Sequence, residues 1–373
     1  MSGNDSRWDS AAREGTAVDA HPVLTPLSSV SRREGQAALA ARLLELQQWL
    51  GADLSELEGK INAFVATGSE TEGETPHLAW RSAAHLLKVP GKRIRPMCVL
   101  LSARVGGLAM TPAVRDLAVA CELVHAATLL HDDVIDEGTE RRGAVTSRVV
   151  YGNSASILAG DQLFVEALQL VNGAGRPELM TELLAVIGEM IEAEAVQLER
   201  RGRFEPSREA YLHVIHGKTA ALFRYGLAAG GRLAGLDEDT IQTLGRVGTA
   251  LGMAFQLVDD VLDLAGDPSV TGKDAMADLR QGKLTWPFLL ACEEDPELAA
   301  RIGAQVASGE AEADEAELVR IVAAVQSSGA VEATRRFACE QGEQAGAELA
   351  RLPEGEARAA LELVVETAIH RAR

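Results

Sequence analysis

Two copies of one acidic pattern, Asp-Asp-x-x-Asp, place the strongest constraint on how this chain can fold. The first copy comprises Asp132, Asp133 and Asp136, and the second comprises Asp259, Asp260 and Asp263. Each copy ends an apolar, helix-forming stretch, where burying carboxylates is costly unless cations neutralise them. Residues four apart share one face of a helix, so the first and last aspartates of each copy point the same way. The fold must bring both clusters to a place that cations can reach.

Clustered carboxylate oxygens without Cys or His suit Mg²⁺, which shares its coordination shell with water and substrate phosphates. A single acidic triplet is most often a solvated helix face, but two copies with the same spacing and apolar flanks favour metal sites. The pattern lacks the alternating carboxylates and the glycine of an EF-hand calcium loop. We therefore expect each cluster to bind Mg²⁺, with Mn²⁺ as the alternative ion, and the two clusters to clamp one diphosphate.

The composition predicts an all-α fold. The 373 residues are 47% apolar but only 4% aromatic, and Ala, Leu, Val, Glu and Arg dominate, a mix that favours helices over strands. Neither strand alternation nor a Gly-x-Gly-x-x-Gly or Walker loop is evident. Helical patterning begins near Gln36. Gly- and Pro-marked breaks follow at residues 88–91, 106–111, 137–143, 172–177, 202–206, 235–238, 266–282 and 295–296. We expect a single large helical bundle around a central cavity.

Residues 1–35 are polar and aperiodic, which predicts a disordered tail, and residues 36–373 are expected to form one domain. No stretch approaches the roughly 20 apolar residues of a membrane span, and the first residues lack the apolar core of a signal peptide. A soluble, cytoplasmic protein is expected.

The four cysteines form no Cys-x-x-Cys pair, which argues against structural zinc. The net charge of −19 disfavours nucleic acid as a partner.

Positive charge is concentrated at a few turns. Basic residues follow or precede glycines in Gly91-Lys92-Arg93-Ile94-Arg95, Arg141-Arg142-Gly143, Gly217-Lys218, Gly272-Lys273 and Gly282-Lys283. A glycine lets the backbone approach an anion, and a nearby cation pairs with phosphate oxygens. Each motif alone is typical of a solvated surface, but together they adjoin the acidic clusters. They imply a substrate with a diphosphate head and a hydrocarbon tail.

Three histidines are weaker candidates. His213 and His216 are spaced for one helix face but lack an evident third ligand, so surface histidines are the favoured interpretation. His125 lies about two helical turns before Asp132 and is placed to reach the same cavity.

In combination and in order, these motifs resemble those of the trans-isoprenyl diphosphate synthases, the polyprenyl synthetase family. The resemblance covers about residues 36–373 and includes Gly160-Asp161, Lys218-Thr219, Gln256 before the second cluster, and Gly282-Lys283-x-Thr285-x-Pro287. It implies an all-α homodimeric prenyltransferase of isoprenoid biosynthesis. Such an enzyme joins isopentenyl diphosphate to an allylic diphosphate by metal-assisted ionisation.

The resemblance also implies roles for individual residues. The residues implied to hold isopentenyl diphosphate are Lys92, Arg95, His125 and Arg142. The implied metal ligands are Asp132, Asp136, Asp259 and Asp263, supported by Asp133 and Asp260. The residues implied to contact the allylic diphosphate or stabilise its departure are Arg141, Lys218, Thr219, Gln256, Lys273 and Lys283.

The helix before Asp132 bears on product length. Residues four and five positions upstream share the face of that aspartate, and here they are Thr128 and Ala127, followed one turn deeper by Val124. The alternative is that small residues only let two helices pack closely. In the family, small residues at these places accompany long products, so a long-chain all-trans polyprenyl diphosphate is expected.

Three alternatives stay open. A geranylgeranyl diphosphate synthase would share all of these motifs. A class I terpene cyclase is less favoured, because its second metal motif is normally of the Asn/Ser/Glu type and its pocket is lined by aromatic residues. A catalytically silent partner subunit would be expected to lose acidic or basic ligands, which this chain retains.

Overall fold

The computed structural model describes residues 37–67, 76–265, 277–280, 282–308 and 314–370. The tail predicted for residues 1–35 lies outside these ranges. The first helices are α2 (Ala37–Thr67), α3 (Leu78–Leu87), α4 (Ile94–Val105), α5 (Pro112–Ile135), α6 (Ser147–Tyr151), α7 (Asn153–Gly173) and α8 (Pro177–Arg200). They are followed by α9 (Arg208–Ile215), α10 (Ala221–Leu233), α11 (Glu238–Ala265), α13 (Ala277–Arg280) and α14 (Trp286–Glu294). The last are α15 (Pro296–Ser308), α16 (Glu315–Ser327), α17 (Ala330–Leu349) and α18 (Glu356–His370).

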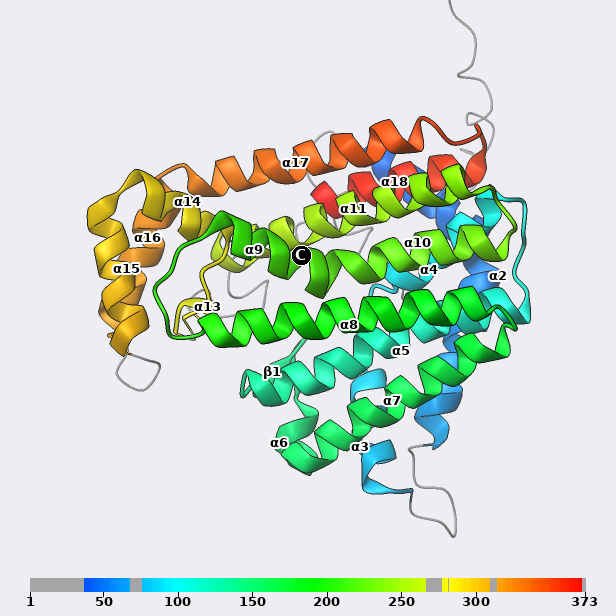
Figure 1. Cartoon of the computed structure of the whole chain (residues 1–373), viewed down its shortest axis with the longest axis horizontal. Helices are drawn as coiled ribbons and strands as arrows, with labels where there is room; N and C mark the ends of the chain where they lie inside the picture. Colours follow the sequence, from blue (N-terminus) through cyan, green and yellow to red (C-terminus); the bar gives the residue numbers. More distant parts are fainter. Residues whose placement is uncertain (1–36, 68–75, 266–276, 281, 309–313, 371–373) are drawn as a thin grey trace, which may run out of the picture.

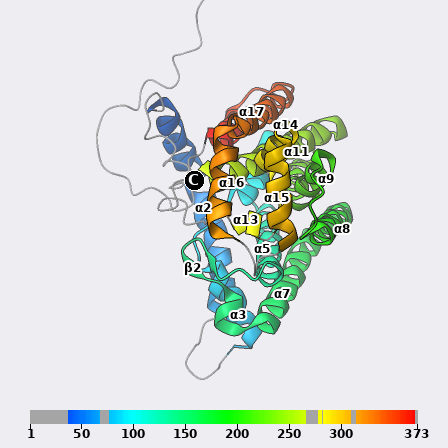
Figure 2. The ribbon, with the colours of Figure 1, turned by 90° about the vertical axis from the view of Figure 1, so that its left-hand side faces the viewer.

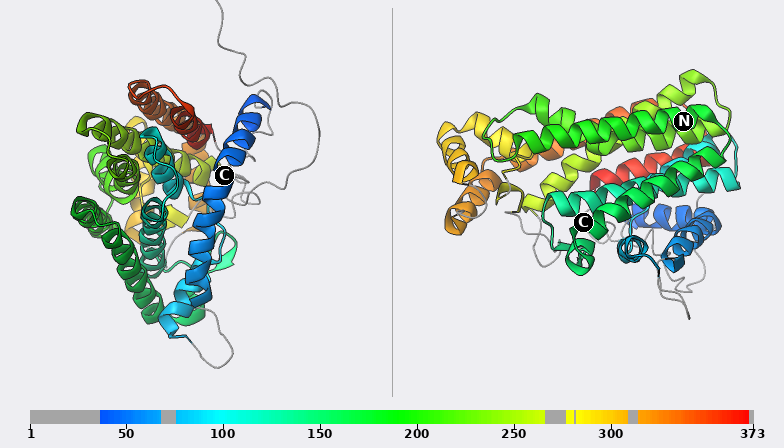
Figure 3. Two further views of the ribbon diagram at one scale, coloured as in Figure 1. Left: turned by 90° about the vertical axis from the view of Figure 1, so that its right-hand side faces the viewer. Right: turned by 60° about the horizontal axis from the view of Figure 1, so that its bottom comes forward.

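Several long helices run along one axis of the molecule, and this almost entirely helical arrangement confirms the all-α prediction. Helices α5, α7, α8, α10, α11 and α17 follow the long axis, while α14, α15 and α16 gather at one end (Figure 1). Seen from that end, α15 and α16 lie side by side (Figure 2). Seen from the opposite end, the blue helix α2 runs along the outside of the bundle (Figure 3). It packs there against α3, α5 and α18.

The main core lies between α4, α5, α7, α8, α10 and α11, and a smaller core holds α14, α15 and α16 together. A glycine sets how closely α11 approaches the chain before α10. A Cβ at Gly252 would lie only 2.5 Å from the Cα of Ala220, so any larger residue would push the two backbones apart. Near the second acidic cluster, Thr219 Oγ1 donates a hydrogen bond to Gln256 Oε1 of α11 at 2.9 Å.

Helix ends fall at the glycines and prolines that predict them. Helix α4 ends at Val105 before the turn at Gly106 and Gly107, and α5 then begins at Pro112. The side chain of Thr111 accepts a hydrogen bond from the Val114 backbone N–H and so caps α5. Pro177 likewise opens α8, where a missing N–H carries no cost.

One small element departs from the sequence expectation. Strands β1 (Glu140–Arg141) and β2 (Ala144–Val145) form an antiparallel hairpin in which Glu140 pairs with Val145 and Arg141 with Ala144. Arg142 and Gly143 make its two-residue turn, and both have positive φ angles, 53° and 75°, as such turns require. Strands of two residues are too short to show alternation in a sequence.

Within the described ranges, every helix is too short or too polar to span a lipid bilayer. The cytoplasmic location expected from the sequence stays a prediction.

Candidate active site

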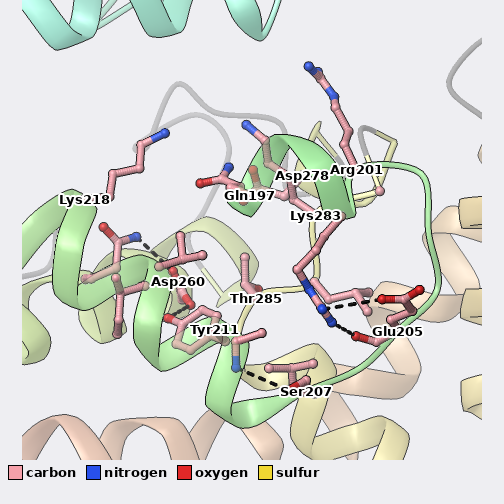
Figure 4. Close-up of a pocket in the computed structure, with 18 of the residues that line it drawn as sticks. Gln197, Arg201, Glu205, Ser207, Tyr211, Lys218, Asp260, Asp278, Lys283 and Thr285 are labelled. Atoms are coloured by element: carbon pink, nitrogen blue, oxygen red, sulfur yellow. Dashed lines mark hydrogen bonds and ion pairs between the residues drawn. The ribbon is translucent and has the colours of Figure 1, made fainter. Parts of the chain in front are cut away.

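A cavity of about 340 Å³ lies between α8, α9, η2 (the π-helical turn His216–Ala220), α11 and the segment leading into α14. Asp136 from the first acidic cluster and Asp260 and Asp263 from the second are among the residues that line it. In Figure 4, Lys218 and Lys283 lie on opposite sides of Asp260. The structure thus brings parts of both clusters, and two of the candidate lysines, to one cavity.

The first cluster lies where α5 ends, and its outer aspartates contact cations. Lys218 Nζ is 3.3 Å from Asp132 Oδ2 and also pairs with Glu194, while Lys283 Nζ is 2.7 Å from Asp136 Oδ2. Burial acts to lower the pKa of Lys218, but attraction to Asp132 and Glu194 raises it overall, so the ammonium stays charged. Burial also raises the pKa of Asp132, against the pull of Lys218.

The middle aspartate of the first cluster is used differently. Asp133 is only 3% exposed, and its Oδ1 accepts hydrogen bonds from Arg141 Nε at 2.9 Å and Nη2 at 2.7 Å. The backbone N–H of Gly138 donates to the Asp133 carbonyl at 2.9 Å. Asp133 therefore fixes the β1–β2 hairpin, and with it Arg142, to the end of α5. The structure pairs Arg141 with Asp133, and the contact of Arg141 with the allylic diphosphate stays a prediction.

The middle aspartate of the second cluster is likewise enclosed by protein donors. Asp260 is 3% exposed. Its Oδ2 accepts hydrogen bonds from the Tyr211 hydroxyl and, at 3.1 Å, from the Trp286 backbone N–H, and its Oδ1 accepts one from Gln256 Nε2 at 3.1 Å. Thr219 Oγ1 in turn donates to Gln256 Oε1 at 2.9 Å. Burial raises the pKa of Asp260 to about 7, although these hydrogen bonds act in the opposite direction.

The π-helical turn η2 carries Lys218 and Thr219 to the cavity wall. Single π turns inside helices are often found at functional sites. The turn packs tightly on α8, since a Cβ at Gly217 would lie 2.7 Å from the Ala193 Cβ and 2.8 Å from the Glu189 carbonyl oxygen. The sequence predicts a helix here but gives no sign of its widened turn.

A second group of cations lies around the start of α4 and the β1–β2 hairpin. The guanidinium of Arg95 lies 4.6 Å from the ring centroid of Phe223, and Arg142 Nη1 donates to the Pro90 carbonyl at 3.1 Å. Burial, reinforced by repulsion from Arg95 and Arg142, lowers the pKa of His125 well below its usual value, so the imidazole is neutral near pH 7. Burial lowers the pKa values of Arg95 and Arg142, and attraction to Glu122 and, more weakly, to Asp259 opposes that lowering. Lys92 adjoins this group in the chain.

Several residues that line the cavity are absent from the sequence expectations: Gln197, Arg200, Arg201, Arg203, Tyr211 and Asp278. Arg201 Nη1 donates to the Ile135 carbonyl at 2.8 Å and lies 3.8 Å from Asp136 Oδ1. The sequence did indicate a basic group here, because three arginines surround Gly202 at a predicted helix break. No comparable pattern in the sequence pointed to Tyr211.

The remaining candidates lie on α5 or outside the described residues. Ala127 and Val124 are fully buried in the main core, and Thr128 is half-buried with its hydroxyl donating to the His125 carbonyl at 2.8 Å. Lys273 lies outside the described ranges.

This chain matches a known protein family and several relatives along most of its length. The family described as "Polyprenyl synthetase" matches residues 77–325. Component 2 of heptaprenyl diphosphate synthase from Geobacillus stearothermophilus is 34% identical over 320 residues, which cover 86% of this chain and 96% of the relative.

Solved structures give the same result. A decaprenyl diphosphate synthase from Rhodobacter capsulatus is 34% identical, with a TM-score of 0.78 over 88% of this chain and 99% of the other. A polyprenyl synthase from Caulobacter crescentus, complexed with calcium and isoprenyl diphosphate, is 34% identical, with a TM-score of 0.77 over 88% of this chain and 97% of the other. The chain therefore belongs to the polyprenyl synthetase family.

Proposed function

We propose that this prenyltransferase condenses isopentenyl diphosphate with an allylic diphosphate and makes a long-chain all-trans polyprenyl diphosphate. The observation that carries the proposal is the shared cavity. Asp136, which directly follows α5, and Asp263 from α11 line it together with Lys218 and Lys283. Anionic and cationic side chains meeting in this way suit a diphosphate bound through metal ions and held by lysines.

The carboxylates fit a hard divalent cation. The proposed ligands are Asp132, Asp136, Asp259 and Asp263, which offer only oxygen atoms. Among the described residues, no three His, Cys, Asp or Glu side chains group closely enough to hold a metal ion by themselves. Mg²⁺ or Mn²⁺ that completes its shell with water and phosphate oxygens is compatible with such open sites. When bound, the ions would neutralise negative charge on the departing diphosphate.

The protein's own groups around the cavity act on the same leaving group. Lys218 and Lys283 lie beside Asp132 and Asp136, where their charges would stabilise diphosphate as its bond to the allylic carbon breaks. Gln256 and Thr219 are linked by a hydrogen bond and help to orient Asp260. Lys273, which lies outside the described residues, is proposed for the same role from the sequence alone.

Isopentenyl diphosphate is assigned to the second cation group. Within the described part of the chain, the buried Nε of Arg95 has no hydrogen-bond partner, which leaves a donor for an anionic ligand. Arg142, the neutral His125 and Lys92 complete the proposed set. A double bond held here would attack the allylic cation, and exclusion of water would protect that cation from hydrolysis.

A long product is proposed from the helix before Asp132. Val124, Ala127 and Thr128 carry no aromatic side chain, so none of them blocks a tail that runs along this face of α5. The relatives named for heptaprenyl and decaprenyl products support the long-chain alternative over a geranylgeranyl diphosphate synthase.

The direct test is incubation of the purified chain with labelled isopentenyl diphosphate and a series of allylic diphosphates. We expect label to enter prenyl diphosphates longer than geranylgeranyl, only with a divalent cation, and to stop when a chelator is added. Chromatography of the dephosphorylated products checks the length. Failure to incorporate label with any primer would contradict the proposal, and cyclic hydrocarbons formed from the primer alone would instead identify a terpene cyclase.

We further propose that a second copy of the chain covers an exposed apolar face. On α8 the side chains of Leu184, Ile191 and Leu198 are 50–64% exposed and recur every seven residues, and Leu158 and Val165 repeat that spacing on α7. Residues seven apart lie on one helix face, and α7 packs against α8. Exposed apolar stripes on neighbouring helices are typical of oligomer interfaces.

Ile191→Glu should convert a wild-type dimer into a monomer in sedimentation analysis, because the interface would have to bury an unpaired charge. Val319→Glu changes another exposed apolar residue, 56% exposed on α16, and should leave the dimer intact. One relative is named as component 2 of its synthase. A wild-type chain that sediments as a monomer would therefore favour a different partner over a second copy.

A further inference from the structure

A buried arginine that the substrate-binding proposal does not use connects three helices. The guanidinium of Arg93 donates from Nε to Glu58 Oε1 at 2.8 Å and from Nη1 to Glu122 Oε1 at 2.5 Å. Glu58 lies on α2, Glu122 lies on α5, and Arg93 precedes the first residue of α4. Arg93 and Glu122 are each 6% exposed. Because burial removes the hydration of both groups, the stability of such an ion pair depends on close contact and good hydrogen-bond geometry between them.

The backbone of Arg93 is itself in an unfavourable conformation. Its φ angle is 47°, in the left-handed region that non-glycine residues rarely adopt. Both carboxylates pair with the Arg93 side chain. The Arg93 guanidinium is thus occupied by protein carboxylates, whereas among the described residues the buried Nε of its neighbour Arg95 has no hydrogen-bond partner.

Glu122 lies close to Gly91, which directly precedes Lys92 of the proposed isopentenyl diphosphate site. A Cβ on Gly91 would lie 2.9 Å from Arg93 Nη1, 3.0 Å from Arg142 Nη1 and 3.4 Å from Glu122 Oε1. The two guanidinium groups and the carboxylate therefore meet around the Cα of Gly91. Attraction to Glu122 is also the largest effect that opposes the lowering of the Arg95 and Arg142 pKa values by burial.

The guanidinium groups of Arg93 and Arg142, both close to Gly91, repel one another unless an anion lies near them. We propose that Glu122 and Glu58, acting through Arg93, are positioning residues that hold Arg142 in place, alongside Arg95, for the diphosphate of isopentenyl diphosphate. This inference rests on the function proposed above. It also gives α2 a part in the site, although α2 precedes the residues that the family matches.

The surroundings of α2 supply a matched control. Glu56, two residues before Glu58, pairs with Arg115 Nη1 at 2.9 Å, and its side chain is 46% exposed. Glu56→Gln therefore removes an ion pair from the same helix without reaching the cluster around Gly91. An exposed pair of this kind contributes little to stability.

The experiment measures kcat and both KM values of the full chain for Glu122→Gln, Glu58→Gln, Glu56→Gln and Arg95→Ala. We expect Glu122→Gln to raise the KM for isopentenyl diphosphate about tenfold, the loss of one charge-assisted contact, with kcat and the allylic KM within about twofold of wild type. Glu58→Gln should act in the same direction more weakly, and Glu56→Gln should act like wild type. Glu122→Asp, which keeps the charge, should restore part of the affinity.

Different failures have different meanings. If Arg95→Ala raises the KM for isopentenyl diphosphate but Glu122→Gln and Glu58→Gln do not, the positioning role is wrong and the assignment of the site stands. If Arg95→Ala leaves that KM unchanged, both proposals are overturned. Loss of folding in both glutamine variants, or equal rises of the two KM values, would show a structural role and also overturn the inference.

Discussion

Asp132→Ala and Asp259→Ala should each reduce turnover by about a hundredfold or more, while the helical circular dichroism of the chain stays intact. The two residues belong to different clusters, on α5 and α11, which meet around one cavity. If both clusters stabilise the same departing diphosphate, losing either one removes stabilisation that arises only in the transition state. The fold should survive, because Lys218 keeps Glu194 as a partner when Asp132 is lost.

The controls are acidic residues on the same two helices. Asp116 on α5 pairs with the neighbouring Arg115 at 2.9 Å, and Asp239 on α11 has an 81% exposed side chain. Asp116→Ala and Asp239→Ala should turn over substrate at the wild-type rate, measured with labelled isopentenyl diphosphate. Near-normal turnover in Asp132→Ala or Asp259→Ala would rule out a site that needs both clusters.

In both clusters the middle aspartate has different surroundings from the two outer ones. In each, the middle residue is 3% exposed and accepts hydrogen bonds from protein donors: Asp133 from Arg141, and Asp260 from Tyr211, Gln256 and Trp286. Neighbouring residues on a helix differ by about 100° in direction. The middle aspartate therefore points away from the face that its outer neighbours share. Its hydrogen bonds can hold in place the backbone that carries those neighbours.

The helical spacing was enough to predict the shared face of each cluster, because that face depends only on local geometry. It was not enough to predict the partners of the middle aspartates. Tyr211 lies 49 residues from Asp260, and only the packing of α9 against its neighbours brings its hydroxyl to that carboxylate. The same holds for Arg93, which is the middle cation of a basic run yet pairs with Glu58, 35 residues away.

In the fold, too, some features could be predicted from the sequence and others could not. Helix ends at Val105, Pro112 and Pro177 follow from residues that cannot continue a helix or that begin one well. The π-helical turn His216–Ala220 follows instead from contact with α8, where Gly217 lies against Ala193. Such a turn has no local signal of its own, since its residues are compatible with an ordinary helix. Tertiary packing decides it.

Ala127→Phe should shorten the product to farnesyl or geranylgeranyl length. Ala127 lies five residues before Asp132 on α5 and is fully buried. If the growing tail runs along this face, an aromatic ring placed here would fill its path one to two helical turns below the first cluster. Chromatography of the dephosphorylated products, with wild type and variant compared under the same primer, measures the change.

Ala126→Phe separates this effect from simple overpacking. Ala126 is 5% exposed and next in sequence, so the same ring enters α5 at the same depth but about 100° around the helix. Overpacking a core costs about 1–3 kcal/mol, and both variants should therefore unfold at a lower temperature. Only Ala127→Phe should also change product length. Equal product distributions in both variants and wild type would show that this face packs against neighbouring helices and that the tail runs elsewhere.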